Sequence, residues 1–273
     1  MTNGKTRQVA TRIGALAVHE FGGGEETIVF WPALYTDHRI YAGQVAAFAG
    51  NYRLLVIDPP GHGDSPVPDD LVSMPDCAEA VIEILDAYGE TAVHWVGTSW
   101  GGIIGSHLGA NHPQRFKSLL LANTPFDHGD PKALRDAKFV VGLAKLFGGS
   151  GFFGKGVGRS FFPDLKRLDK AKLGVFLSGI ARQTRKSLTL AGRSVLIVRD
   201  SLLPVLPLVK VRTKVVAGEQ DKLYPPADLR KAAALIPGAE FDITEGTGHL
   251  SAFEAPGAFN ALLTDWLNVP ARS

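Results

Sequence analysis

The pattern of apolar and polar positions divides the chain into short strands and longer helices. Apolar runs of strand length recur along the sequence, and residues typical of turns separate them. We expect eight strands, at 8–13, 16–21, 27–30, 53–58, 92–97, 116–122, 214–217 and 239–244. Helical patterns lie between them at 37–49, 74–88 and 100–111, and a last one covers 251–267. A leading antiparallel pair followed by alternating strands and helices predicts a mostly parallel α/β sheet with helices on both faces.

One long segment departs from this alternation. After the sixth predicted strand, helical and glycine-interrupted sequence continues to about residue 212 before a strand pattern returns. We therefore expect one core, formed by 1–126 and 213–273, with a helical insertion at 127–212. Between 131 and 212 there are 17 Lys and Arg but only 4 Asp and Glu, a balance of +13. The whole chain carries +2, so the remainder is acidic and the insertion is the basic part of the molecule.

The pentapeptide 97–101, Gly-Thr-Ser-Trp-Gly, follows a predicted strand and opens a predicted helix. A serine on such a sharp turn needs small neighbours, because its backbone is strained and flanking Cβ atoms would crowd it. Ser99 is therefore a candidate nucleophile. A serine hydroxyl is weakly nucleophilic at neutral pH, so the chain must also supply a base, an orienting acid and donors for an oxyanion.

Partners of the required types follow later strands. His249 lies between the strand 239–244 and a helical pattern, where we expect a mobile and unburied imidazole that can act as a general base. Asp221 follows the strand 214–217, and it is our choice for the orienting acid over Asp127, which follows the sixth strand. The order Ser, Asp, His is that of the triad in α/β-hydrolases.

With these motifs the chain resembles the α/β-hydrolase fold superfamily, as a capped, single-domain serine hydrolase of the esterase or carbon–carbon hydrolase kind. Residues 58–65, DPPGHGDS, are similar to its D-x-x-G-x-G-x-S turn, and 248–256, GHLSAFEAP, to its G-H-x-x-x-x-E-x-P helix start. We interpret His62 as a turn residue and Glu254 as a carboxylate favoured by the helix dipole. The resemblance implies that 127–212 is a helical cap, or lid, over the active site.

The resemblance also implies oxyanion donors and a pocket. The family usually carries His-Gly after its third strand, whereas this chain has Trp31-Pro32. By position, the backbone N–H groups of Trp100 and Ala33 are the expected oxyanion donors, with Leu34 as the next choice to Ala33. The side chains that we expect in the substrate pocket are Trp31, Leu34, Phe153 and Phe161.

Composition narrows the class of protein. The single cysteine, Cys77, excludes an intrachain disulfide framework, and no spacing of side chains indicates a metal site. We find neither a signal-peptide pattern nor an apolar run long enough to cross a bilayer, so we expect a cytoplasmic protein, monomeric or homodimeric. The basic cap suits an anionic acyl substrate, an acidic carrier or an anionic membrane surface, and no nucleic-acid motif accompanies it.

Together these features predict a cofactor-free serine hydrolase that cleaves a carboxylic ester, thioester or lactone through an acyl-enzyme on Ser99. Two alternatives remain open. The same residues would serve a hydrolase of carbon–carbon bonds in ring-cleavage diketones, and the same fold serves ligand-binding proteins in which hydrolysis is slow.

Overall fold

The computed structural model describes residues 4–127, 131–166 and 168–268 and contains one eight-stranded sheet. The strand order is β1-β2-β4-β3-β5-β6-β7-β8. β2 runs antiparallel to both β1 and β4, and every other neighbouring pair is parallel. The predicted fold class, a mostly parallel α/β-hydrolase sheet, is confirmed.

The strands are β1 (Lys5–Thr11), β2 (Gly14–Gly22), β3 (Thr27–Trp31), β4 (Arg53–Ile57), β5 (Val93–Thr98), β6 (Phe116–Ala122), β7 (Thr213–Gly218) and β8 (Glu240–Thr244). The α-helices are α1 (Ala42–Phe48), α2 (Met74–Tyr88), α3 (Trp100–Asn111), α4 (Pro131–Phe147), α5 (Gly151–Phe161), α6 (Lys170–Arg182), α7 (Arg185–Arg193), α8 (Pro226–Ala233), α9 (Ser251–Glu254) and α10 (Pro256–Leu267). Shorter 3-10 or π turns are η1 (His38–Tyr41), η2 (Pro113–Arg115), η3 (Ser194–Val198) and η4 (Leu206–Leu208).

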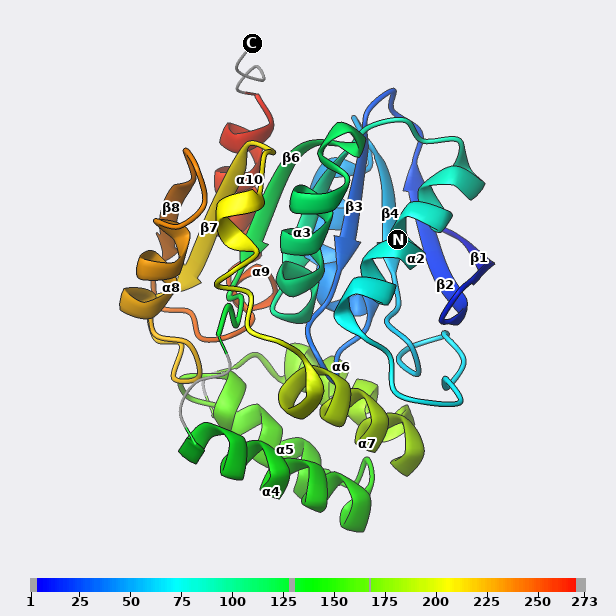
Figure 1. Ribbon diagram of the computed structural model, residues 1–273. Helices are drawn as coiled ribbons and strands as arrows, with labels where there is room; N and C mark the ends of the chain where they lie inside the picture. Colours follow the sequence, from blue (N-terminus) through cyan, green and yellow to red (C-terminus); the bar gives the residue numbers. More distant parts are fainter. Residues whose placement is uncertain (1–3, 128–130, 167, 269–273) are drawn as a thin grey trace.

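Helices cover both faces of the sheet. α2 and α3 lie on one face, and α1 and α10 lie on the other (Figure 1). The central strands β3 and β5 are buried along their whole length, and every residue of β3 after Thr27 is apolar. The carboxyl ends of the parallel strands all point toward the four helices α4 to α7 (Figure 1). Residues that follow different strands therefore meet at this edge.

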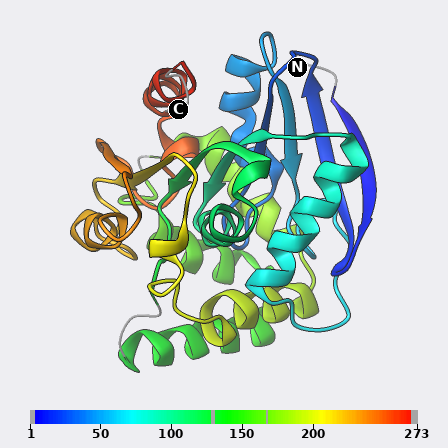
Figure 2. The same cartoon turned by 45° about the horizontal axis from the view of Figure 1, so that its top comes forward.

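The helices α4 to α7, which we call the cap helices, come from the segment between β6 and β7. α4 packs against α7, and α5 packs against α6. In both ribbon views α4 follows the edge of the molecule farthest from the sheet (Figure 2). Residues 128–130 and 167 of the predicted cap, and the ends of the predicted core at 1–3 and 269–273, lie outside the described residues. None of the helices described here has the length and apolar content needed to cross a bilayer.

Two predicted helices are each divided in the structure. The pattern at 37–49 forms the turn η1 and then α1, and the pattern at 251–267 forms α9 and then α10. The second break falls at Ala255 because Pro256 lacks an N–H and favours the first position of a new helix. Both breaks are local, and the resulting helices lie within the two predicted ranges.

Candidate functional site

Ser99 lies at the turn between β5 and α3 in a strained conformation. Its φ is 54° and its ψ is −102°, a combination that few residues other than glycine adopt. A Cβ at Gly97 would collide with the carbonyl group of Gly101, and a Cβ at Gly101 would collide with that of Trp31. The two glycines of the motif are therefore required by the close approach of the turn, the helix and β3.

Ser99 and His249 are joined by a hydrogen bond. Ser99 Oγ lies 2.9 Å from His249 Nε2, and His249 Nδ1 lies 2.8 Å from Asp221 Oδ2. With Asp221 ionised, His249 Nδ1 is the donor to the carboxylate, and Nε2 is left as the acceptor for the serine hydroxyl. The structure thus brings the three predicted residues into one chain of hydrogen bonds, although they come from three different strand ends.

Asp221 is held as an anion. Burial opposes its ionisation, but the charge and hydrogen bond of His249 and the bonds from Tyr224 N–H and Asn123 keep its pKa below the usual value. Its Oδ1 accepts from the N–H groups of Leu223 and Tyr224 at 2.9 and 3.1 Å. Its lone pairs are thus engaged on both oxygens, which fixes the plane of the carboxylate.

Asn123 was not predicted, and it connects the acid to the histidine loop. It follows β6 with a φ of 51°, a conformation that Asn tolerates better than most residues. Its Nδ2 donates to Asp221 Oδ2 at 3.1 Å and to the carbonyl oxygen of Gly248 at 3.0 Å. Ser251 Oγ donates to Asn123 Oδ1 at 2.7 Å, which fixes the amide orientation. No local sequence pattern indicates this role, because it depends on contacts between distant segments.

Glu254 holds the same loop from the other side. Its carboxylate accepts the N–H of Gly248 at 3.0 Å and that of Leu250 at 3.0 Å, the two residues that flank His249. Burial raises the pKa of Glu254 to about 7, against the opposing effect of these two N–H donors. Glu254 was predicted as a carboxylate favoured by the helix dipole, and in the structure it also holds the loop that contains His249 through these two hydrogen bonds.

His62 fixes the loop that follows β3. Its buried ring accepts the N–H of Tyr35 at Nε2, at 3.1 Å, and its Nδ1 lies 2.9 Å from the carbonyl oxygen of Pro60. Burial lowers the pKa of His62, which favours the neutral form that these two bonds need. The ring also contacts the Trp100 ring edge-on, with centroids 5.7 Å apart. His62 lies in a turn, as predicted, and in addition it connects the loop at 33–36 to the start of α3.

A cavity of about 1150 Å³ opens beside Ser99 and His249. Core loops and cap helices both contribute to its lining, which is mainly apolar and includes Leu34, Phe153 and Phe161. Phe161 also contacts His249 directly. Its carbonyl oxygen accepts the N–H of His249 at 2.7 Å, and its ring lies 4.9 Å from the imidazole centroid. The end of α5 is thus attached to the histidine.

Two expectations differ from the structure. Trp31 does not line the cavity, because its side chain at the end of β3 is fully buried between the Trp95 and Trp100 rings. His249 is only 1% exposed and is not the unburied loop residue that we expected, since Phe161 and Tyr224 cover it. The choice of Asp221 over Asp127 agrees with the structure, because Asp127 is exposed and its Oδ1 accepts from Ser201 Oγ at 2.8 Å.

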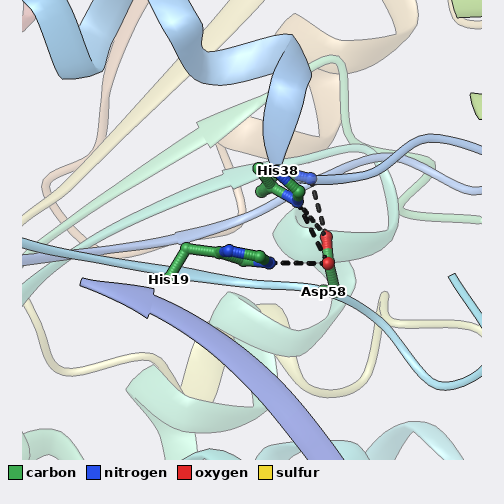
Figure 3. A group of neighbouring side chains, drawn as sticks. All are labelled: His19, His38 and Asp58. Carbon is green, nitrogen blue, oxygen red and sulfur yellow. Dashed lines mark hydrogen bonds and ion pairs between the residues drawn. The ribbon is translucent and has the colours of Figure 1, made fainter. Parts of the chain in front are cut away.

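A second cluster of histidines and a carboxylate lies outside the cavity (Figure 3). His19 Nε2 lies 2.8 Å from Asp58 Oδ2, and His38 Nδ1 lies 3.0 Å from Asp58 Oδ1. In the described part of the chain, this is the group whose spacing would allow a metal ion. The two rings stack with centroids 3.6 Å apart, whereas imidazoles on a tetrahedral metal approach it from well-separated directions. The geometry favours a buried ion-pair cluster.

Comparison with known proteins agrees with this fold. Residues 26–256 match the alpha/beta hydrolase fold family. The chain is 31% identical over 265 residues, 89% of its length, to the dihydrolipoyllysine-residue acetyltransferase component of the acetoin cleaving system of Cupriavidus necator, and the match spans 63% of that protein. It is 31% identical to the pimeloyl-[acyl-carrier protein] methyl ester esterase of Xanthomonas oryzae pv. oryzae, over 77% of this chain and 82% of that one.

The same likeness is found among solved structures. A hydrolase from Pseudomonas aeruginosa PA01 has a TM-score of 0.86 and 27% identity, with 97% of this chain and 99% of that one covered. The chain belongs to the alpha/beta hydrolase fold family, which confirms the resemblance seen in the sequence. Relatives named as esterases are consistent with the predicted enzyme class, a carboxylic ester hydrolase.

Proposed function

We propose that the protein hydrolyses a carboxylic ester through an acyl-enzyme on Ser99. The observation that carries this proposal is the relay in which Ser99, His249 and Asp221 are joined at 2.9 and 2.8 Å beside a large cavity. The relative named as a methyl ester esterase supports the same class of reaction.

The first half of the reaction follows from the tautomer of His249. Nε2 takes the proton of Ser99 as Oγ attacks the ester carbonyl, and Asp221 stabilises the imidazolium that forms. The imidazolium then returns this proton to the oxygen of the leaving alcohol, and the acyl group remains on Ser99. In the second half, His249 removes a proton from water, which attacks the acyl-enzyme and releases the acid.

Two backbone donors are proposed for the oxyanion, the N–H groups of Trp100 and Ala33. Trp100 is the first residue of α3, and N–H groups in a first helical turn have no partner within the helix. Ala33 follows β3, whose last residue touches the start of α3 at Gly101. Thr36 donates from both N–H and Oγ1 to the carbonyl oxygen of Ala33, at 3.1 and 2.7 Å, so this loop is preorganised.

The cavity supports an acyl substrate larger than acetate. Its volume exceeds the range of about 300–1,000 Å³ that small-molecule sites usually occupy, and its walls are mainly apolar. Five cationic side chains line it, among them Arg159 and Lys222, against three carboxylates, so an anionic group on the substrate would meet net positive charge. We therefore propose medium or long acyl esters, with a thioester or lactone as variants of the same chemistry.

The experiment is hydrolysis of p-nitrophenyl esters from acetate to decanoate by the wild type and by Ser99→Ala. We expect activity that rises with acyl length and falls by at least about 10⁴-fold in the variant. Thermal unfolding of both proteins shows whether the variant is folded. Activity that survives in a folded Ser99→Ala protein, or a wild type inactive on every ester, would contradict the proposal.

A further inference from the structure

Four large apolar side chains, Phe139, Leu146, Phe147 and Phe152, are exposed on the outer side of α4 and α5. Their exposed fractions are 67%, 64%, 39% and 62%. Phe139 and Leu146 lie seven residues apart and share one stripe of α4. The rings of Phe147 and Phe152 lie 5.0 Å apart, so the two helices contribute to one surface. We call these four residues the apolar patch.

The apolar patch is not needed to hold the cap together. α4 uses a different stripe for packing, where Val141 and Ala144 are buried, and α5 buries Phe153, Val157 and Phe161. Monomeric proteins seldom expose several aromatic side chains together without a binding role.

Cations surround the apolar patch. Lys132 and Arg135 share the exposed stripe of α4, while Lys155 and Arg159 lie on the face of α5 that carries Phe152. Arg135, Lys155 and Arg159 have no ion pair within the part of the chain that the structure describes, whereas Lys132 pairs with Asp136 at 2.7 Å. This local charge belongs to a segment whose balance is +13.

The apolar patch adjoins the opening of the cavity. Phe139 and Phe152 belong to it and also line the cavity, as do Lys132 and Arg159. Other exposed side chains of the lining, Leu203, Leu223 and Leu235, mark the same opening. α4 lies at the end of the molecule away from the sheet (Figures 1 and 2), so this surface can meet a flat partner without obstruction from the core.

We propose that the apolar patch and its four surrounding cations dock the protein on an anionic lipid surface, with the mouth of the cavity toward the bilayer. Aromatic and leucine side chains enter the interface between headgroups and acyl chains, and Lys and Arg are attracted to anionic headgroups. Both kinds of side chain are exposed here on the outer side of α4 and α5. An acyl substrate that resides in the bilayer would then reach Ser99 without crossing water.

A protein partner fits these observations less well. An acidic carrier protein would pair with the cations, but it would leave most of the protruding phenylalanines in water. Lipid accommodates exposed apolar side chains of any arrangement, because the headgroup region has no fixed shape to match.

The test is co-sedimentation of the folded Ser99→Ala protein with vesicles, so that hydrolysis does not alter the lipid. One set is phosphatidylcholine alone, and the other is an equimolar mixture of phosphatidylcholine and phosphatidylglycerol. We expect binding to the mixed vesicles that decreases with added salt. Substituting Arg135→Gln or Lys155→Gln should each weaken it about fivefold. Phe139→Ser with Leu146→Ser should weaken it by about tenfold or more.

Matched controls lie at the opposite end of the sheet. Leu208 is 57% exposed and Lys210 is exposed, and both precede the amino end of β7. Leu208→Ser and Lys210→Gln should leave vesicle binding unchanged. The proposal is overturned if the mixed vesicles do not bind the protein, or if the controls weaken binding as much as the patch variants. It is also overturned if soluble polyglutamate binds equally well and the phenylalanine and leucine substitutions have no effect, which would indicate an acidic protein partner.

This outcome is independent of the proposed function. Vesicle binding uses a protein that cannot form an acyl-enzyme, so a failure of docking leaves ester hydrolysis untouched. Conversely, a wild type without esterase activity would still show whether the apolar patch binds lipid.

Discussion

Among the residues that the structure describes, hydrogen bonds join a hydroxyl, an imidazole and a carboxylate in a chain at two places, and one of these two chains lies beside a cavity. Ser99, His249 and Asp221 form the first. In the second, Thr6 Oγ1 lies 3.0 Å from His19 Nδ1, and His19 Nε2 lies 2.8 Å from Asp58 Oδ2. The distances are nearly the same in both. A hydrogen-bonded relay is therefore not sufficient to define a reactive serine or threonine.

The surroundings of the two hydroxyls differ. Ser99 has a strained backbone, precedes the first turn of α3 and faces the cavity, whereas Thr6 lies on the edge strand β1. The carboxylates differ as well. Asp221 serves one imidazole, but Asp58 is shared by two stacked ones, and it also accepts the N–H groups of His38 and Asp64. The first arrangement leaves one imidazole nitrogen for chemistry. The second connects β2, β4 and η1.

Among the residues that support Ser99 and His249, Asp221 should have the largest effect on activity when it is changed to Asn. Without the carboxylate, nothing holds the His249 proton on Nδ1, and the imidazolium loses its counter-charge. We expect kcat for the best p-nitrophenyl ester to fall about 10⁴-fold. The midpoint of thermal unfolding should change far less than it does in Asp58→Asn.

The reverse outcome would contradict the distinction between the two clusters. If Asp221→Asn kept more than about a tenth of the wild-type kcat, Asp221 would not be the acid of the relay.

Asp58→Asn should break the second cluster and act on stability. Removing one partner of a buried ion pair costs about 3–5 kcal/mol, which at this chain length corresponds to about 10 °C in the unfolding midpoint. Burial opposes ionisation of Asp58, but hydrogen bonds from His19 and His38 hold its pKa below the usual 3.8. The stabilisation of the fold by ionised Asp58 is therefore present above about pH 3.8 and is lost as the pH falls further.

The measurement is thermal unfolding of wild type and Asp58→Asn over a range of pH, together with kcat below the unfolding transition. Equal midpoints near neutral pH would show that the cluster does not stabilise the fold. A loss of kcat comparable to that of Asp221→Asn in the folded variant would show that it takes part in the reaction.

Asn123→Gly tests a positioning residue with a smaller effect. Glycine keeps the φ of 51° without strain, so the substitution removes mainly the side-chain hydrogen bonds to Asp221, Gly248 and Ser251. We expect kcat to fall about tenfold, with little change in KM, because Asp221 and the loop that contains His249 are no longer joined by hydrogen bonds to one side chain.

Asn260→Gly is the matched control. Asn260 also makes two hydrogen bonds, to Gln44 and to the carbonyl oxygen of Gly43, but it joins α10 to α1 away from the cavity. It should lower the unfolding midpoint without lowering kcat. If both variants lost kcat equally, Asn123 would act only through stability.

Sequence patterns predicted the elements and the three relay residues because each depends on local chemistry. Strand periodicity located Ser99, Asp221 and His249 at strand ends, and a parallel sheet brings such ends together. The roles of Asn123 and His62 depend on contacts between segments distant in sequence, which no local pattern encodes. Trp31 was assigned to the pocket because it follows the predicted strand 27–30, but the direction of its side chain is set by Trp95 and Trp100.

Glu254→Gln should have the smallest effect of these substitutions. It should change the midpoint of thermal unfolding, by an amount that depends on pH. A glutamine oxygen still accepts the N–H groups of Gly248 and Leu250, so the histidine loop stays in place. Burial raises the pKa of Glu254 to about 7 in the folded protein, against about 4.5 for an unperturbed side chain. Between these values the folded state holds a proton that the unfolded state has lost, so the wild type loses stability as the pH rises through this interval.

Glutamine does not titrate, so Glu254→Gln should gain in unfolding midpoint relative to the wild type from about pH 4.5 to about pH 7. Above that interval the gain should level off. Glu25→Gln, at an exposed position before β3, controls for the loss of one negative charge. A constant difference between wild type and Glu254→Gln across this range would mean that Glu254 is ionised throughout. The two N–H donors would then outweigh the burial that separates Glu254 from water.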